Sequence, residues 1–254
     1  MEGGNGTVTL YKGGRPFYGE ALGILMLDMK APLIPGNVGN ANSYDFPVRF
    51  KVLENVPSDW WCDAQGPDEK RFQIFVKAAK ELEAEGVRAI TTGCGFFAIY
   101  QKKAAPLLKV PLFASPLLMV PMVWRMIGEN QRVGIISAGG KHLSSGDFLV
   151  NVGIDPSIPI AVGGLENTEE FHHVHVTQKK LDIDPEKMER EVVSVALELV
   201  RQFPDIGAFV FECSDIPPFA RATQEATGLP VFDFITLAHL VYRATVPRSY
   251  HGFM

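Results

Sequence analysis

Two of the three cysteines, Cys94 and Cys213, stand in similar surroundings. Cys94 follows an apolar stretch over residues 87–91 and is flanked by glycines, and Cys213 follows an apolar stretch over 206–211. An unperturbed thiol titrates near ~8.5, so a cysteine can accept or donate a proton close to neutral pH. Two opposed thiols would remove a proton from one face of a carbon acid and return one to the other face.

The carbanion formed in such a reaction needs hydrogen-bond donors. Gly93, Gly95 and Ser214 border the cysteines at strand-to-helix turns, where backbone N–H groups favour an anion. We expect a small substrate carboxylate to lie there while it gains enediolate character.

The elements that position these residues alternate between strands and helices. Continuous apolar runs predict buried strands, and apolar residues at helical spacing predict helices. The strands are expected over residues 21–27, 87–91, 110–114, 132–137, 206–211 and 229–232, and the helices over 67–86, 98–108, 185–203, 218–227 and 235–245. Repeated βα units indicate an α/β fold with mostly parallel sheets.

An internal repeat divides the chain into two similar halves. When Cys94 is aligned with Cys213, an offset of 119 residues, Pro111 falls on Pro230. Each half then has a helix, a strand, a cysteine at the strand end, a helix and another strand. We expect two pseudo-symmetric lobes, 1–117 plus 236–254 and 118–235, with the active site in the cleft between them, because ligands bind at the carboxyl ends of open parallel sheets.

Composition excludes several other classes of protein. The formal net charge is −5 with no basic block, which argues against binding of nucleic acid. An odd number of cysteines in a chain of this length is not a disulfide framework. The sequence has no apolar stretch that would span a membrane and no leader at its start, so we expect a cytoplasmic protein.

Four motifs resemble the two-cysteine, cofactor-independent superfamily of aspartate, glutamate and hydantoin racemases. They lie at residues 35–40 (PGNVGN), 91–96 (TTGCGF), 212–218 (ECSDIPP) and 226–233 (ATGLPVFD). The resemblance covers about residues 21–245, and the superfamily also includes arylmalonate decarboxylase and maleate isomerase.

This resemblance implies a racemase or epimerase of an amino acid or a related α-substituted carboxylate, without a cofactor and commonly as a homo-oligomer such as a dimer or tetramer. Cys94 and Cys213 would be the acid/base pair. The implied substrate-binding residues are Asn37, Thr92, Gly95, Phe96, Ser137 and Ser214.

The same motifs also resemble the algal dimethylsulfoniopropionate lyases, in which proton removal by one cysteine would lead to β-elimination. A sulfonium group would then bind aromatic rings through cation–π attraction. The candidates are Phe96, Phe97, Tyr100, Tyr44 and Phe46. Racemisation of aspartate or glutamate would instead require a cation such as Arg49 or Arg15. A catalytically silent module that binds small carboxylates is a third hypothesis.

The remaining candidates favour structural roles. Cys62, beside two tryptophans, is interpreted as a packing residue. The histidines at 172, 173 and 175 lack an acidic or cysteine partner at metal-ligand spacing, which favours a surface or inter-subunit loop. Glu166 is expected as a solvated loop carboxylate, with a place in the cleft as the alternative. Asp233 either orients Cys213 or a substrate amine, or caps the following helix.

Overall fold

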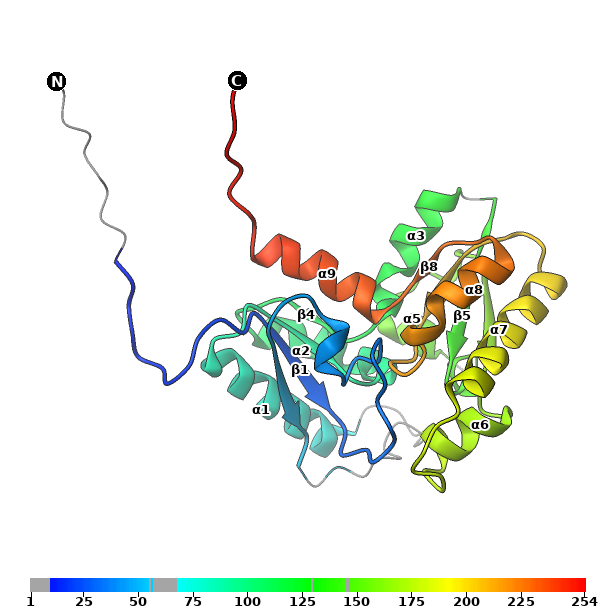
Figure 1. The fold of residues 1–254 in the computed structure, drawn as a ribbon, viewed down its shortest axis with the longest axis horizontal. Coiled ribbons are helices and arrows are strands. Elements are labelled where there is room, and N and C mark those ends of the chain that lie inside the picture. Colours follow the sequence, from blue (N-terminus) through cyan, green and yellow to red (C-terminus); the bar gives the residue numbers. More distant parts are fainter. Residues whose placement is uncertain (1–9, 55, 57–67, 129, 145–146) are drawn as a thin grey trace.

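A computed structural model describes residues 10–54, 56, 68–128, 130–144 and 147–254. Within these residues the strands form two four-stranded parallel sheets, ordered β2-β1-β3-β4 and β6-β5-β7-β8. Figure 1 shows the two sheets in two lobes that lie side by side, each flanked by helices. This arrangement confirms the predicted α/β fold of two lobes.

The strands are β1 (Leu22–Met26), β2 (Val48–Val52), β3 (Ala89–Thr92), β4 (Leu112–Phe113), β5 (Arg132–Ser137), β6 (Ile160–Gly164), β7 (Ile206–Phe211) and β8 (Val231–Phe232). The α-helices are α1 (Glu69–Glu85), α2 (Gln101–Ala104), α3 (Val120–Ile127), α4 (Gly140–Ser144), α5 (Phe148–Val152), α6 (Glu169–Phe171), α7 (Pro185–Gln202), α8 (Ala220–Thr227) and α9 (Phe234–Thr245). Short 3₁₀ turns are η1 (Ala41–Ser43), η3 (Gly95–Tyr100), η4 (Ala105–Leu107), η5 (Pro116–Met119) and η7 (Pro217–Phe219), and η6 (His172–Val176) is a π-helical turn.

The two sheets have the same connectivity, which confirms the repeat. β3 pairs with β1 and β4, and β7 pairs with β5 and β8, so the strands before the two cysteines hold equivalent central positions. Each of these strands is buried along its whole length. The fixed central strands place both cysteines at the carboxyl ends of their sheets.

Local sequence signals explain the limits of the long helices. α1 begins after Asp68, whose side chain accepts the backbone N–H of Lys70, and it ends at Gly86 with φ of 94°. Only glycine adopts this left-handed conformation without strain. α7 begins after Asp184, whose side chain accepts the N–H of Lys187.

Two expectations about these elements were wrong in detail. The single helix predicted over 98–108 is instead η3, α2 and η4, because Pro106 lacks the N–H that an α-helix requires. Strands β2 and β6 were missed. Both are edge strands and are only partly buried, so neither has a continuous apolar run.

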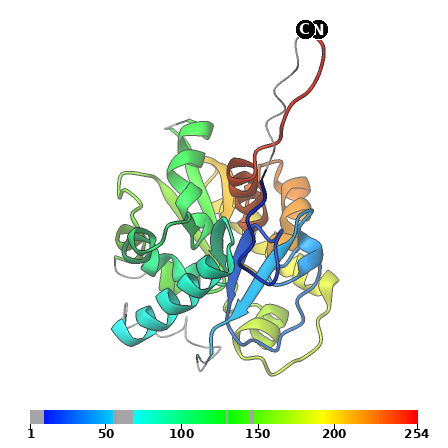
Figure 2. The same cartoon turned by 90° about the vertical axis from the view of Figure 1, so that its left-hand side faces the viewer.

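The chain passes from the first lobe to the second before α3, and it returns to the first lobe through α9. α3 contacts β5 and β7 of the second lobe, and the C-terminal helix α9 returns to contact β3 of the first. Figure 2 shows residues 246–254 running out from α9, away from both lobes. No helix in the described part of the chain is both long and apolar enough to cross a membrane.

Candidate active site

A cavity lies where the carboxyl ends of the two sheets face each other. The residues lining it are Leu27, Met29, Gly93, Cys94, Gly95, Phe96, Ala138, Phe171, His175, Glu212, Cys213, Ser214 and Asp215. Both motif cysteines therefore line one cavity, which is the central expectation from the repeat.

The turn after β3 is fixed by the side chain of Thr92. Its Oγ1 donates to the carbonyl oxygens of Cys94, at 2.9 Å, and Ala114, at 2.7 Å. Because Ala114 follows β4, this side chain ties the Cys94 turn to the neighbouring strand. Thr92 is fully buried and lies behind the cavity rather than on its wall.

The turn after β7 is tied to the opposite lobe. Ser214 Oγ donates to the carbonyl oxygen of Gly93 at 2.8 Å, and the Ser214 carbonyl accepts the N–H of Val38 at 3.2 Å. Asn37 Nδ2 donates to Oδ1 of Asp215 at 2.8 Å. These bonds across the cleft fix the two cysteine turns relative to each other.

Asp215 is the carboxylate next to Cys213. Cys213 Sγ lies 3.6 Å from Oδ2 of Asp215 and donates to it, and the Asp215 N–H donates back to Sγ at 3.5 Å. Burial raises the pKa of the Cys213 thiol, and the negative charge of Asp215 raises it further. Cys213 is therefore a protonated thiol with a proton acceptor beside it.

His175 also lines the cavity, and the interpretation of this histidine as part of a surface or inter-subunit loop was wrong. It lies on the π-helical turn η6, its side chain is 3% exposed, and Nδ1 is 3.6 Å from Oδ2 of Asp215. Its two histidine neighbours have other surroundings: His172 contacts the carbonyl oxygen of Glu166, and His173 is exposed. Among the described residues no cluster of three potential ligands could hold a metal.

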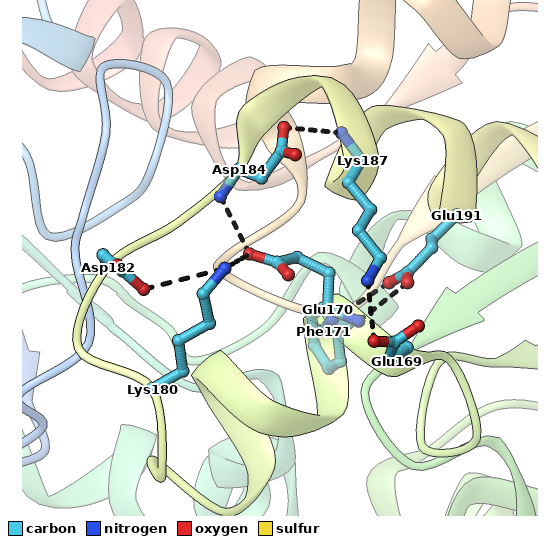
Figure 3. A network of polar contacts seen from close by, with 8 residues as sticks. All are labelled: Glu169, Glu170, Phe171, Lys180, Asp182, Asp184, Lys187 and Glu191. Atoms are coloured by element: carbon cyan, nitrogen blue, oxygen red, sulfur yellow. Dashed lines mark hydrogen bonds and ion pairs between the residues drawn. The ribbon is translucent and has the colours of Figure 1, made fainter.

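A network of ion pairs and hydrogen bonds holds the segment that carries His175. The Glu191 carboxylate accepts the backbone N–H groups of Glu170 and Phe171, at 2.7 and 2.9 Å. Buried Glu170 accepts from Lys180 Nζ at 2.6 Å and from the Asp184 N–H at 2.8 Å. Figure 3 shows that these contacts join α6, the following loop and the start of α7.

Glu212 is the second carboxyl group of the cavity. Its side chain is fully buried, and Oε2 accepts a hydrogen bond of 2.8 Å from Ser137 Oγ. A Cβ atom on Gly95 would lie 2.1 Å from the Glu212 carbonyl oxygen, so only glycine fits at that position of the opposite lobe. Gly95 thus allows the two cysteine motifs to approach each other.

The predicted site residues divide into two groups. Cys94, Cys213, Gly95, Phe96 and Ser214 line the cavity. The other three lie behind it and bond to residues that line it: Asn37 to Asp215, Thr92 to Cys94, and Ser137 to Glu212. Direct contact of these three with a substrate stays a prediction.

Sequence reasoning missed four lining residues that bear on chemistry, namely Asp215, Glu212, His175 and Phe171. The two carboxyl groups stand inside the 212–218 motif and could have been found there. His175 is 40 positions from Asp215 in sequence, and no local pattern indicates their contact.

The remaining aromatic and cationic candidates have structural roles. Phe97 and Tyr100 pack in the core of the first lobe, Tyr44 OH donates to the Val38 carbonyl, and Phe46 stacks on Tyr242. Of the five aromatic candidates only Phe96 lines the cavity.

Arg49 and Arg15 both bond to Glu85, at a distance from the lining residues. Glu166 lies in the loop after β6, as expected, and is half-buried; it does not line the cavity, and its carboxylate accepts the N–H groups of Gly140 and Lys141 at the start of α4. Asp233 is the N-cap of α9 and accepts from Thr236, which decides between its two proposed roles. Cys62 lies outside the described residues.

Comparisons with known proteins give two kinds of similarity. The chain is 31% identical to a dimethylsulfoniopropionate lyase of Durusdinium sp. clade D over 237 residues, which cover 91% of this chain and 77% of that protein. It is 30% identical to dimethylsulfoniopropionate lyase 7 of Emiliania huxleyi over 239 residues, 91% of this chain and 69% of that protein. No family model matches the chain.

Solved structures share the fold at low sequence identity. A cysteine mutant of arylmalonate decarboxylase in its sulfate-associated form has a TM-score of 0.61 and 14% identity, with 90% of this chain and 94% of that chain covered. Aspartate racemase of Picrophilus torridus has a TM-score of 0.55 and 14% identity, with 91% and 96% covered. These similarities confirm the racemase-type fold.

Proposed function

The chain belongs to the family of the dimethylsulfoniopropionate lyases, and from this premise we propose that it is a carbon–sulfur lyase acting on a 3-sulfoniopropionate such as dimethylsulfoniopropionate. The observation that carries the proposal is the charge of the cavity. The described lining residues include two carboxyl groups, Asp215 and Glu212, and no Lys or Arg.

This lining fits a substrate with one carboxylate and a cationic head. Asp215 supplies a negative charge, and the rings of Phe96 and Phe171 supply faces that attract a sulfonium group. The second carboxylate of aspartate or glutamate would lie in this cavity without a cationic partner, which is costly in a buried site. The lining therefore favours the lyase over an aspartate or glutamate racemase.

The reaction is a β-elimination with balanced atoms. A base removes the proton from Cα, and the electron pair of that C–H bond forms the double bond between Cα and Cβ. The Cβ–S bond breaks with its pair on sulfur, so the sulfonium leaves as a neutral dialkyl sulfide and the product is an unsaturated carboxylate. The leaving group needs no proton, so one base is sufficient.

We assign the base to Cys213, because its Sγ donates to the carboxylate of Asp215. Burial and neighbouring negative charge raise the pKa of its thiol. A sulfonium cation entering the cavity offsets this by favouring the thiolate. The cationic substrate would thus activate its own base, and a neutral analogue would not.

Racemisation remains the second candidate, since Cys94 and Cys213 line the same cavity. The two reactions differ in how many thiols they need. Inversion requires a donor and an acceptor on opposite faces, whereas elimination requires one base. Single cysteine variants therefore separate them.

The test is an NMR assay in D₂O with dimethylsulfoniopropionate, and with L-aspartate and L-glutamate as comparison substrates. We expect formation of acrylate and dimethyl sulfide, no deuterium at Cα of the amino acids, loss of turnover in Cys213→Ser and measurable turnover in Cys94→Ser. Deuterium exchange with inversion, abolished in both variants, would establish the racemase instead. Binding of substrates without either reaction would indicate a silent binding module.

A further inference from the structure

Glu212 has one oxygen in a hydrogen bond and one without a partner. Oε2 accepts from Ser137 Oγ at 2.8 Å, while Oε1 is buried and has no hydrogen-bond partner among the described residues. The side chain is fully buried and the residue lines the cavity. An unpartnered carboxyl oxygen in a cavity wall is available to hydrogen-bond a ligand.

The surrounding bonds locate the proton of a neutral Glu212. Ser137 Oγ accepts the N–H of Gly139 at 3.2 Å and donates its own proton to Oε2. Oε2 is therefore the carbonyl-type oxygen, and the proton of the acid is on Oε1. This places a hydrogen-bond donor, and not an acceptor, on the unpartnered atom.

Gly95 leaves this donor uncovered. A Cβ atom at position 95 would lie 2.2 Å from Oε1, inside any allowed contact. Because glycine has no side chain, no atom of residue 95 takes that space. The opposite lobe therefore approaches Glu212 closely without supplying a partner for Oε1.

We propose that Glu212 is a neutral carboxylic acid whose Oε1–H donates a hydrogen bond to the substrate carboxylate. The bond strengthens as proton removal from Cα gives that carboxylate enediolate charge, so it stabilises the transition state more than the ground state. The assignment of this partner rests on the proposed carboxylate substrate. A buried, protonated carboxyl group that donates to an oxyanion is an established type of catalytic group.

The charge state follows from the surroundings of Glu212. The pKa of Glu212 is raised to about 8, mainly because the group is buried. The hydrogen bond from Ser137 lowers this pKa, and the negative charge of Asp215 raises it. Glu212 is consequently neutral at pH 7 and ionises above about pH 8. An ionised Glu212 would repel the carboxylate that the neutral acid binds.

Infrared spectroscopy tests the charge state without turnover. We expect the wild-type protein to show the carbonyl band of a protonated carboxyl group at pH 7, which disappears above about pH 8 and is missing in Glu212→Gln. Ser137→Ala should move the disappearance to higher pH, because the Ser137 bond favours the ionised form. A band that is absent at pH 7, or that persists in Glu212→Gln, would overturn the proposal.

Propionate binding, followed by NMR titration, tests the role. Above about pH 8 wild-type affinity should fall about tenfold for each pH unit, whereas Glu212→Gln, which keeps a donor and the shape, should lack this decline. Propionamide should show little pH dependence in either protein. Other ionisable groups line the same cavity, namely Asp215, His175, Cys94 and Cys213. Loss of the decline in Glu212→Gln is therefore the result that assigns the fall in propionate affinity to Glu212.

The outcomes separate this inference from the proposed function. Wild-type propionate binding that is absent, or independent of pH, would overturn the role of Glu212 even where the lyase reaction is observed. A decline with pH that is lost in Glu212→Gln would support it even where dimethylsulfoniopropionate is not cleaved. If Glu212→Gln does not fold, the infrared titration of the wild-type protein and of Ser137→Ala decides.

Discussion

The imidazole of His175 lies against the carboxylate of Asp215, with 3.6 Å between Nδ1 and Oδ2. The side chains are 3% and 10% exposed, and the histidine comes from a π-helical turn whereas the aspartate follows β7. Since Oδ2 also accepts from Cys213 Sγ, His175, Asp215 and Cys213 form a connected row along the cavity. Asp215 therefore stands as a proton acceptor between the thiol and the imidazole.

The carboxylate in this row should be required for turnover. Asp215→Asn keeps the shape but removes the charge that accepts the Cys213 proton, so we expect kcat for the sulfonium substrate to fall by about 100-fold or more. Asp147→Asn, at an N-cap position whose side chain makes no capping bond, is the control and should leave kcat unchanged. Equal rates for the two variants would remove Asp215 from the mechanism.

His175 should act through its contact with Asp215. His175→Leu is expected to lower kcat about tenfold with a smaller change in KM, because the substrate carboxylate and sulfonium contacts are retained. His173→Gln changes an exposed histidine two positions away and should behave as wild type in steady-state kinetics. A change in KM alone would instead indicate that His175 contacts the substrate directly.

The two cavity cysteines should differ in alkylation. Burial and the negative charge of Asp215 raise the pKa of the Cys213 thiol, and the thiolate is the reactive form. We expect iodoacetamide to modify Cys213 more slowly than the half-buried Cys94 at pH 7, with the Cys213 rate rising as the pH increases. Peptide mass spectrometry measures both rates, and faster modification of Cys213 at pH 7 would contradict the assigned protonation state.

Because of the network around Glu170, the free energy of unfolding should depend on pH in the acidic range. Burial alone raises the pKa of Glu170, but the hydrogen bonds from Lys180 and the Asp184 N–H outweigh it, so the pKa lies below its ordinary value. A carboxyl group with a lowered folded-state pKa stabilises the protein above its unfolded-state pKa of about 4.3, and this stabilisation is lost as pH falls through the folded-state value.

Urea unfolding at several pH values measures this dependence. Glu170→Gln should be less stable than wild type at pH 7, and the difference should shrink as the pH falls below about 4. Glu169→Gln alters the adjacent, exposed carboxylate and should have a much smaller effect at every pH. If Glu170→Gln is less stable than the wild type by the same amount at every pH, the loss of stability comes from altered packing and not from the charge of Glu170.

Gly95→Ala tests the close approach of the two lobes. The new Cβ would collide with backbone of the other lobe, the Glu212 carbonyl oxygen at 2.1 Å, so the lobes must separate or the strand end must shift. We expect a loss of about 1–3 kcal/mol in unfolding free energy and a larger proportional loss of turnover. Gly13→Ala, whose Cβ would meet only Tyr18 at 4.0 Å, is the matched control.

Much of the scaffold could be predicted because its signals are local. The limits of β5 and β7 agree with the apolar runs 132–137 and 206–211, and α1 and α7 agree with their amphipathic patterns and caps to within two residues. β4 and β8 are shorter than expected because Pro111 and Pro230 cannot donate to a strand neighbour.

The sequence by itself determined the repeat, the two cysteines and their place at strand ends, since hydrophobic period and motif spacing are properties of neighbouring residues. The fold then brought Cys94 and Cys213 to one cavity, as the repeat predicted. The tertiary structure alone decided the contact of His175 with Asp215 and the unpartnered oxygen of Glu212 beside Gly95. These depend on burial and on distances between segments far apart in sequence, and both quantities exist only once the two lobes have packed together.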